Sequence, residues 1–328
     1  MASLLFVIDV LFYDIMKYKK GEKKMLDICL LGTGGMMPMP NRFLTAMLAR
    51  LNGRLLLIDC GEGTQVSMKL LGWGFKTIDV ICFTHFHADH ISGLPGMLLT
   101  IGNAGRTEPL TLIGGTGLQY VVEGLKRIAP ELPFPLEYIE LKEDSANPIE
   151  VNGFRISYVV VDHMVRCYAY RIDVARKGKF DLKRAQQQNI PKAIWSKLQK
   201  EGNAVWEGKQ YYADMVMGAE RKGISVVYCT DSRPVDRIIP FAKKTDLFIC
   251  EGMYGEEEKK KKAIEKKHMI FSEAAMLAKQ AEVSRLWLTH FSPALLEPEL
   301  YLQNASKWFQ GAELGEERKT ISLYFTEE

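Results

Sequence analysis

A short apolar run, rich in β-branched residues and ending at a polar residue, recurs along this sequence. This pattern occurs at 54–64, 78–90, 155–163, 224–234, 246–255 and 285–293. Runs of this kind predict buried strands. Helical patterns lie between several of them, for example at 115–129 and 272–281. Strands that alternate with helices predict an α/β protein whose helices cover its sheets.

Candidate metal ligands stand at the carboxyl ends of four of these runs. One run ends in a cluster that begins at His85, and the others end at His163, Asp231 and His290. In open α/β sheets, functional groups gather beyond the carboxyl ends of the strands. We therefore expect these side chains to meet in one site.

The cluster at 85–90 reads His-X-His-X-Asp-His and holds half of the six histidines in the 328-residue chain. The spacing predicts that His85 and His87 lie on one side of an extended turn, and that Asp89 and His90 follow as the chain bends. Imidazole and carboxylate groups together suit zinc, with manganese or iron less favoured. With the three residues at the other strand ends the set exceeds one tetrahedral ion, whereas two ions that share a carboxylate would use every member. Surface or hydrogen-bonded histidines are the alternative, and they leave the spacing unexplained.

The composition is that of a soluble protein with a large core. Hydrophobic residues make up 47% and charged residues 25% of the chain, and the net charge of +3 does not by itself predict an anionic partner. The six cysteines include no Cys-X-X-Cys pair, and five of them lie in or at the end of apolar runs. We therefore expect buried free thiols and a reducing, cytoplasmic environment.

The amino terminus carries an apolar segment at 4–16 that is too short to span a bilayer and is interrupted by Asp9 and Asp14. No basic residue precedes it and no small-residue cleavage site follows it, so a signal peptide is not expected. We expect residues 1–24 to be an extension that need not belong to the native protein. The domain proper would occupy 25–328 and begin with a strand at 26–32. A short packed or membrane-surface helix is the alternative, and no membrane partner is expected.

Positive charge is concentrated in residues 173–223, which hold 11 Lys and Arg residues against 6 Asp and Glu residues. Five aromatic residues are interspersed with this charge: Phe180, Trp195, Trp206, Tyr211 and Tyr212. Helices are predicted at 180–188 and 191–202, and a hairpin at 204–212. A basic projection of this kind suits contacts with phosphates. The alternative is a solvated surface excursion. The charged run at 255–268 predicts a solvated loop near the mouth of the site.

Taken together, the motifs resemble the metallo-β-lactamase superfamily and, within it, the ribonuclease Z family. The resemblance extends from about Leu26 to the C-terminal strand. It rests on "LGTGGMMPMPNR", "LLIDCGEGTQ", "CFTHFHADHISGLPG", "VDHMVRCYAYRI", "YCTDSRP", "CEGMYG", "HMIFSEAAMLA" and "LWLTHFSP". It implies an αββα sandwich with two mixed β-sheets flanked by helices, usually dimeric. It further implies an endonuclease that removes 3′ trailers from precursor tRNA and leaves a tRNA 3′-hydroxyl.

The resemblance also implies a role for individual residues. His85, His87 and His163 would hold one zinc ion, Asp89, His90 and His290 would hold the other, and Asp231 would bridge them. Two such ions would lower the pKa of a water molecule toward neutral pH. Asp89 would be the general base, and His268, oriented by Glu251, would protonate the departing ribose oxygen. For His268 the alternative is a solvated helix cap. Asp59 would steady the ligands by hydrogen bonds, or would simply be a turn residue.

The segment at 173–223 matches, by position, an inserted arm that binds tRNA in this family. The Gly-Pro pair common in that arm is missing, and "NIPKAIW" stands in its place. Two other classes of function stay open. Another hydrolase of the same fold would use the same two-zinc site on a small phosphodiester or on a sulfate or lactone ester. A non-catalytic RNA-binding module would leave the complete ligand set unexplained.

Overall fold

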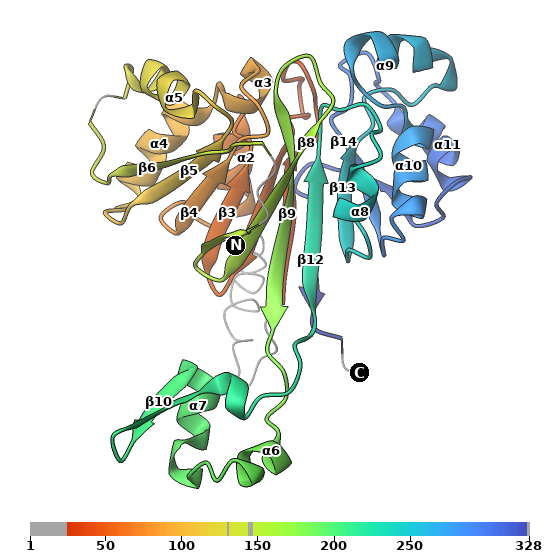
Figure 1. Cartoon of the computed structure of the whole chain (residues 1–328). Coiled ribbons are helices and arrows are strands. Elements are labelled where there is room, and N and C mark those ends of the chain that lie inside the picture. Colours follow the sequence, from red (N-terminus) through yellow and green to blue (C-terminus); the bar gives the residue numbers. More distant parts are fainter. Residues whose placement is uncertain (1–24, 130, 144–146, 327–328) are drawn as a thin grey trace, which may run out of the picture.

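The computed structural model describes residues 25–129, 131–143 and 147–326, which form two β-sheets packed face to face between helices (Figure 1). The extension expected at 1–24 lies outside the described residues. The domain begins with the predicted strand, β1 (Met25–Gly32). Each sheet has seven strands, and each is part antiparallel and part parallel.

The first sheet contains the two chain ends of the domain. In spatial order its strands are β16 (Thr320–Tyr324), β1, β2 (Ala46–Leu51), β3 (Arg54–Ile58), β4 (Ile78–Cys82), β5 (Leu110–Gly114) and β6 (Leu136–Glu140). The pairs from β16 to β3 are antiparallel, and the pairs from β3 to β6 are parallel. The carboxyl ends of β3 and β4 therefore lie side by side at one edge.

The second sheet repeats this mixture of directions. Its strands, in spatial order, are β15 (Ala312–Leu314), β14 (Leu286–Thr289), β13 (Leu247–Glu251), β12 (Arg221–Cys229), β9 (Cys167–Arg176), β8 (Phe154–Val161) and β7 (Ile149–Val151). β12 to β15 pair in parallel, while β9 is antiparallel to both β12 and β8. β8, β12, β13 and β14 consequently run in the same direction. The six predicted strands are confirmed as β3, β4, β8, β12, β13 and β14.

Helices cover the outer face of each sheet, which gives four layers. The first sheet is covered by α2 (Thr64–Leu71), α4 (Leu94–Asn103) and α5 (Leu118–Lys126), and the second by α8 (Ile238–Phe241), α10 (Phe271–Gln280) and α11 (Leu302–Ser306). The short α3 (Ala88–Ile91) and α9 (Lys260–Lys266) lie at the same end of the sandwich (Figure 1). The helices expected at 115–129 and 272–281 are α5 and α10. The 3₁₀ turns η3 (Glu257–Lys259) and η4 (Pro298–Tyr301) precede α9 and α11.

Alternate residues of β1 divide the core into layers. Leu26, Ile28 and Leu30 pack between the two sheets, whereas Cys29 and Leu31 pack beneath the helices. This is the period of two that a strand imposes on its side chains. Both faces are buried, so the strands appear in the sequence as continuous apolar runs rather than as alternating ones. All six cysteines are buried and free, as predicted. Over the described residues, no helix has the length and apolar character that crossing a membrane requires.

The basic segment leaves the sandwich between β9 and β12 and projects from the end distant from α3 and α9 (Figure 1). It contains α6 (Leu182–Gln187), η1 (Lys192–Ile194), α7 (Trp195–Glu201), η2 (Ala213–Met215) and a hairpin of β10 (Asn203–Trp206) with β11 (Lys209–Tyr212). Gly202 caps α7 in a left-handed conformation, so the two predicted helices and the predicted hairpin are present. Buried side chains such as Leu198 and Tyr211 give the segment a small core of its own. The ends of the predicted segment, 173–176 and 221–223, belong to β9 and β12, so we call residues 177–220 the arm.

Candidate metal centre

Seven candidate ligands gather at one edge of the sandwich. His85 and His87 follow β4, Asp89 and His90 lie in α3, and His163, Asp231 and His290 follow β8, β12 and β14. The last three meet because their strands run in the same direction and end at the same edge. The loop after β1 joins the loop after β14 there, since the N–H of Gly35 donates to the carbonyl of Phe291 at 3.0 Å. The structure thus brings together all seven residues that the sequence singled out.

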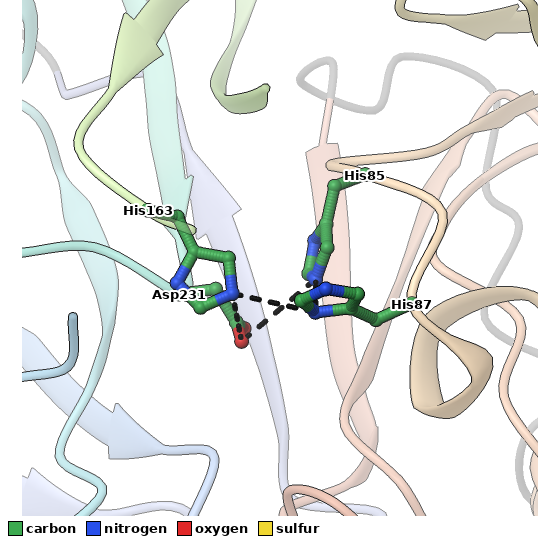
Figure 2. A group of neighbouring side chains, drawn as sticks. All are labelled: His85, His87, His163 and Asp231. Carbon is green, nitrogen blue, oxygen red and sulfur yellow. Dashed lines mark hydrogen bonds and ion pairs between the residues drawn. The ribbon is translucent and has the colours of Figure 1, made fainter. Parts of the chain in front are cut away.

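One group of ligand atoms surrounds a point between the two sheets (Figure 2). Nε2 of His85 lies 2.9 Å from Nδ1 of His87, and Nε2 of His163 lies 3.3 Å from the same atom. Oδ2 of Asp231 lies 3.6 Å from Nε2 of His163 and 3.9 Å from Nε2 of His85. All four ligand atoms lie within 4.8 Å of one another, which is compact enough to hold one metal ion.

The second group lies on the other side of Asp231. Oδ1 of this carboxylate is 3.2 Å from Nε2 of His90 and 3.1 Å from Nε2 of His290. Oδ2 of Asp89 is 3.5 Å and 3.6 Å from the same two nitrogens. Asp231 therefore turns one oxygen toward each group, which is the arrangement of a carboxylate shared between two ions.

Unpaired polar atoms test whether these side chains suit a metal. Nε2 of His90, Nε2 of His290 and Oδ1 of Asp231 are buried and, among the described residues, have no hydrogen-bond partner. A buried polar atom left unsatisfied costs about 1–3 kcal/mol. Each of the three is an atom that would coordinate an ion, and an imidazole and carboxylate donor set suits zinc. The residues therefore fit the metal centre that the sequence predicted.

Hydrogen bonds on the outer side of the rings fix which nitrogen faces the site. Nδ1 of His90 donates to Oδ2 of Asp59 at 2.8 Å, and Nδ1 of His163 donates to the carbonyl of Lys267 at 3.2 Å. Both contacts leave Nε2 free to bind a metal. Thr84 supports the cluster, because its N–H donates to Asp59 Oδ1 at 2.9 Å and its hydroxyl lies 3.1 Å from Nδ1 of His85. The supporting role expected of Asp59 is confirmed. Thr84 and Lys267 were not predicted, although each immediately precedes a histidine of the site.

The protonation of the ligands follows from their burial and charges. Burial, and next the charge of His90, hold the pKa of His85 well below its usual range, and burial also lowers the pKa of His163. Burial would raise the pKa of Asp231, but His290 and His90 hold it well below its usual range. Burial would lower the pKa of His90, but Asp231 and Asp59 raise it well above its usual range. A metal ion that binds here would therefore displace a proton from His90, whereas His85 would be neutral before the ion binds.

The backbone turns into the left-handed region at the strand ends that carry the site. φ is 62° at Asp59, 52° at Asp231 and 59° at His290. Non-glycine residues adopt this conformation rarely, and such positions concentrate at functional sites.

Gly61 allows α3 to approach β3 closely. A Cβ atom built at Gly61 would lie 1.9 Å from the carbonyl oxygen of Asp89, a distance at which the backbone must move. The N–H of Cys60 donates to the carbonyl of His90 at 2.7 Å, which holds the two segments together. The positions of Asp89 and His90 thus depend on the absence of a side chain at Gly61.

Glu251 and His268 lie beside the metal ligands. Oε2 of Glu251 is 3.1 Å from Nδ1 of His268 and accepts the N–H of Met269 at 3.1 Å. Both side chains are buried, so the alternative of a solvated histidine is wrong. Burial would lower the pKa of His268, but the charge of Glu251 and the hydrogen bond with it raise the pKa to about 9. His268 also lies within ligand distance of Asp231 and His290, so geometry alone allows a third metal group.

A cavity of about 510 Å³ opens onto the ligands. Besides histidines and aspartates it is lined by Met36, Met164, Tyr254, Lys262, Lys266 and Ser292. The N–H of Met36 donates to Oδ2 of Asp89 at 2.7 Å. The prediction of a loop at 255–268 was wrong, because most of this run is helical, as η3 and α9. The run does lie at the mouth of the site, as expected.

Comparison with known proteins gives two near full-length relatives. The chain is 55% identical over 303 residues to a ribonuclease Z of Clostridium kluyveri, covering 92% of this chain and 100% of the relative. It is 56% identical over 306 residues to a ribonuclease Z of Clostridium acetobutylicum, covering 92% and 99%. A family model described as the anti-Pycsar protein Apyc1 matches residues 26–173.

Solved structures identify the fold. A metallo-β-lactamase fold protein of Bacillus subtilis, YhfI, superimposes with a TM-score of 0.66 at 20% identity and covers 92% of this chain and 100% of its own. The short form of human tRNase Z gives a TM-score of 0.65 at 23% identity, with coverage of 90% and 98%. These likenesses and the two helix-covered mixed sheets confirm the predicted αββα sandwich.

Proposed function

This chain belongs to the ribonuclease Z family and is an endoribonuclease of tRNA 3′ processing; we propose that it works with two zinc ions held at the seven ligands. It removes 3′ trailers from precursor tRNA and leaves a 3′-hydroxyl on the tRNA. The first group, with His85, His87 and His163, would hold one ion. The second, with Asp89, His90 and His290, would hold the other, and Asp231 would serve both. Manganese is the alternative metal.

The metal ions, when bound, supply an acidified water molecule and positive charge for the phosphate oxygens. The protein supplies the groups that move protons. Asp89 is the general base in this proposal, because its Oδ2 faces the ligands while the N–H of Met36, 2.7 Å away, holds the carboxylate in place. Burial would raise the pKa of Asp89, but the neighbouring His290 and His90 hold it well below its usual range. The carboxylate is therefore ionised, which is the state that a proton acceptor requires.

His268 is the general acid in this proposal, and Glu251 orients it. His268 lies on the wall of the cavity next to the ligands, and its hydrogen bond of 3.1 Å with the buried Glu251 fixes the ring through Nδ1. Nε2 is then the atom that faces the departing ribose oxygen. A positioned proton donor of this kind speeds such a step by roughly 10²- to 10⁴-fold.

The observation that most directly supports this function is that Asp231 lies between two groups of candidate ligand atoms. The test is to incubate the purified protein with a 3′-extended precursor tRNA and, separately, with a bis-nitrophenyl phosphodiester. We expect one internal cut in the tRNA, with a 3′-hydroxyl on the tRNA fragment. Turnover of the small diester without any cut in the RNA would instead favour a small-molecule hydrolase of the same fold.

The arm is the proposed tRNA-binding element. At its base Arg176, Lys177, Lys179, Lys200 and Arg221 line a groove together with aromatic side chains. A groove with several Lys and Arg side chains suits the phosphates of a folded RNA. Such an RNA is recognised by its shape more than by its sequence. The arm lies at the end of the sandwich distant from the metal centre (Figure 1), so the RNA must extend along the molecule to engage both.

A homodimer is the proposed assembly. Val66 and Leu70 on α2 and Leu99 on α4 are 51%, 63% and 42% exposed, and the side chains of Gln65 and Thr100 join the two helices by a hydrogen bond. A second copy of this chain would cover this apolar strip. Light scattering after size exclusion should report a dimer for the wild type and a monomer for Leu70→Asp. A monomeric wild type would refute the proposal.

The proposed location is the cytoplasm. All six thiols are free, although Cys229 and Cys250 are register partners on adjacent strands. Free thiols persist in a reducing compartment. Fluorescence of a tagged copy in the native cell would check the location.

A further inference from the structure

The helix α9 presents two lysines to the cavity over the metal centre. Lys262 and Lys266 stand four residues apart and therefore share one face of the helix. Both line the cavity, whereas Lys261, on the same helix, does not. Among the described residues that line it, these two are the sole lysine or arginine side chains.

The helix is fixed to the site by its own packing. Ala263 is fully buried in a cluster with Met253, Tyr254 and Ile270. Beyond the helix, Lys267 adopts φ 60°, and its ammonium lies 2.9 Å from both oxygens of Asp162. Its carbonyl accepts the hydrogen bond from the ligand His163. The two lysines therefore belong to a helix whose position relative to the candidate metal ligands is fixed.

Local contacts hold Lys262 at the cavity. Its ammonium lies 5.4 Å from the ring centroid of Tyr254, which is itself buried against the site. A cation over an aromatic face is attracted to it, which restrains a side chain that would otherwise move freely. Lys266 is exposed and forms an ion pair with its neighbour Glu265, at 3.2 Å. One ammonium is thus positioned, and the other is free to meet a ligand.

We propose that Lys262 and Lys266 bind the phosphate of the RNA that adjoins the scissile phosphate on the side of the departing 3′-oxygen. The inference rests on the proposed function, because it takes His268 as the donor to that oxygen. α9 ends one residue before Lys267 and thus leads directly to His268. In this proposal the scissile phosphate lies at the side of the cavity formed by the candidate metal ligands. The adjoining RNA phosphate, on the side of the departing 3′-oxygen, then faces the wall that carries the two lysines. The pair positions the 3′ end of the tRNA, which the distant arm does not contact.

The test compares Lys262→Gln/Lys266→Gln with a control of equal charge change, Lys261→Gln/Lys307→Gln. Each protein is given three substrates: a 3′-extended precursor tRNA, a short acceptor-stem hairpin with the same trailer, and a bis-nitrophenyl phosphodiester. The hairpin is too short to engage the arm, and the diester has no neighbouring phosphate. Metal content and diester turnover report whether the fold and the metal centre are intact.

We expect the cavity variant to lose roughly tenfold in kcat/KM on both RNAs, the size expected of two charge-assisted contacts that keep part of their hydration. The slope of log kcat/KM against log salt should fall by about 0.7 for each lysine that no longer neutralises a phosphate. Diester turnover should match that of the control. If the cavity variant cleaves both RNAs as fast as the control variant, this proposal is wrong and the proposed function is unaffected. If the cavity variant loses as much activity on the diester as on the RNAs, the lysines support the fold and the proposal is also wrong. A wild type that cuts neither RNA would overturn the proposed function and this inference together.

Discussion

Nδ1 of His268 lies 3.1 Å from Oε2 of Glu251, and the carboxylate is completely buried. A buried carboxylate is costly unless it is paired. Here Oε2 is satisfied by the imidazole and by the N–H of Met269, and Oε1 accepts the N–H of Ser232. The pair is therefore a rigid unit at the side of the metal ligands.

The first prediction concerns that unit. His268→Ala should slow cleavage of precursor tRNA by roughly 10²- to 10⁴-fold, because the departing oxygen loses its proton donor. Glu251→Ala should act in the same direction, and the double variant should be little worse than His268→Ala, because the two residues work together. Single-turnover kinetics measures the effect.

Two controls separate an acid from a metal ligand at His268. A nitrophenyl ester has a good leaving group and needs little protonation, so the defect should shrink on that substrate. Metal content should stay near that of the wild type. A variant that has lost metal, or is equally slow on both substrates, would assign His268 to the ligand set with Asp231 and His290.

The second prediction concerns the shared carboxylate. Asp231→Ala should deplete both metals, because its two oxygens face different ligand groups. His163→Ala should reduce the content from about two ions per chain toward one, since this ring belongs to one group. Elemental analysis of protein purified without chelators gives the ratio. Asp173→Asn, a carboxylate paired with Arg171 on β9, is the matched control and should keep both ions. Equal metal loss in the Asp231 and His163 variants would refute the bridge.

The third prediction concerns backbone packing under α3. Gly61→Ala should destabilise the protein by about 1–3 kcal/mol, the usual cost of overpacking, since the new methyl group would meet the carbonyl of Asp89. Gly124→Ala in α5 is the control, because no atom lies within 4 Å of its Cβ position, and it should stabilise the helix by about 0.5–1 kcal/mol. Urea unfolding of both variants measures the difference. Similar stability in the two would mean that α3 moves freely.

The fourth prediction concerns the arm. Replacing Lys177, Lys179, Lys183 and Arg184 with glutamine should raise KM for precursor tRNA and flatten its salt dependence by about 0.7–0.9 for each phosphate that is no longer neutralised. Turnover of a small diester should not change, since it does not reach the arm. A control variant in which Lys76, Arg127, Lys279 and Lys307 are replaced with glutamine has the same charge change on exposed positions of the helix-covered body. Unchanged tRNA kinetics in the arm variant would refute the arm as the tRNA-binding element, and slower turnover of both substrates would assign the segment to the fold.

The strands and the positions of the seven candidate ligands at strand ends were predictable because their signals are local. A strand buried on both faces appears as an apolar run, and the ligands stand where such runs end, as at Cys82 and Cys229. The pairing of those strands was not predictable. β9 lies between β8 and β12 in space, and that order depends on contacts between residues such as Tyr170 and Tyr228 that are far apart in the chain.

The error at 255–268 has a physical reason. The run contains only Ala263 and Ile264 as apolar residues in its helical part, so no amphipathic period is visible. The helix forms because Ala263 docks against Met253 and Ile270, a tertiary contact that overrides the weak local pattern. The contact between Lys267 and His163 is also tertiary, and it uses a backbone carbonyl, which any residue type would supply. The sequence therefore contains no sign of it.

A zinc titration of the metal-stripped protein, followed by cleavage of a 3′-extended precursor tRNA, tests whether two ions are needed. We expect no cleavage before zinc is added and activity that saturates at about two equivalents per chain, with a 3′-hydroxyl on the tRNA product. Saturation at one equivalent, or cleavage by the stripped protein, would contradict this expectation.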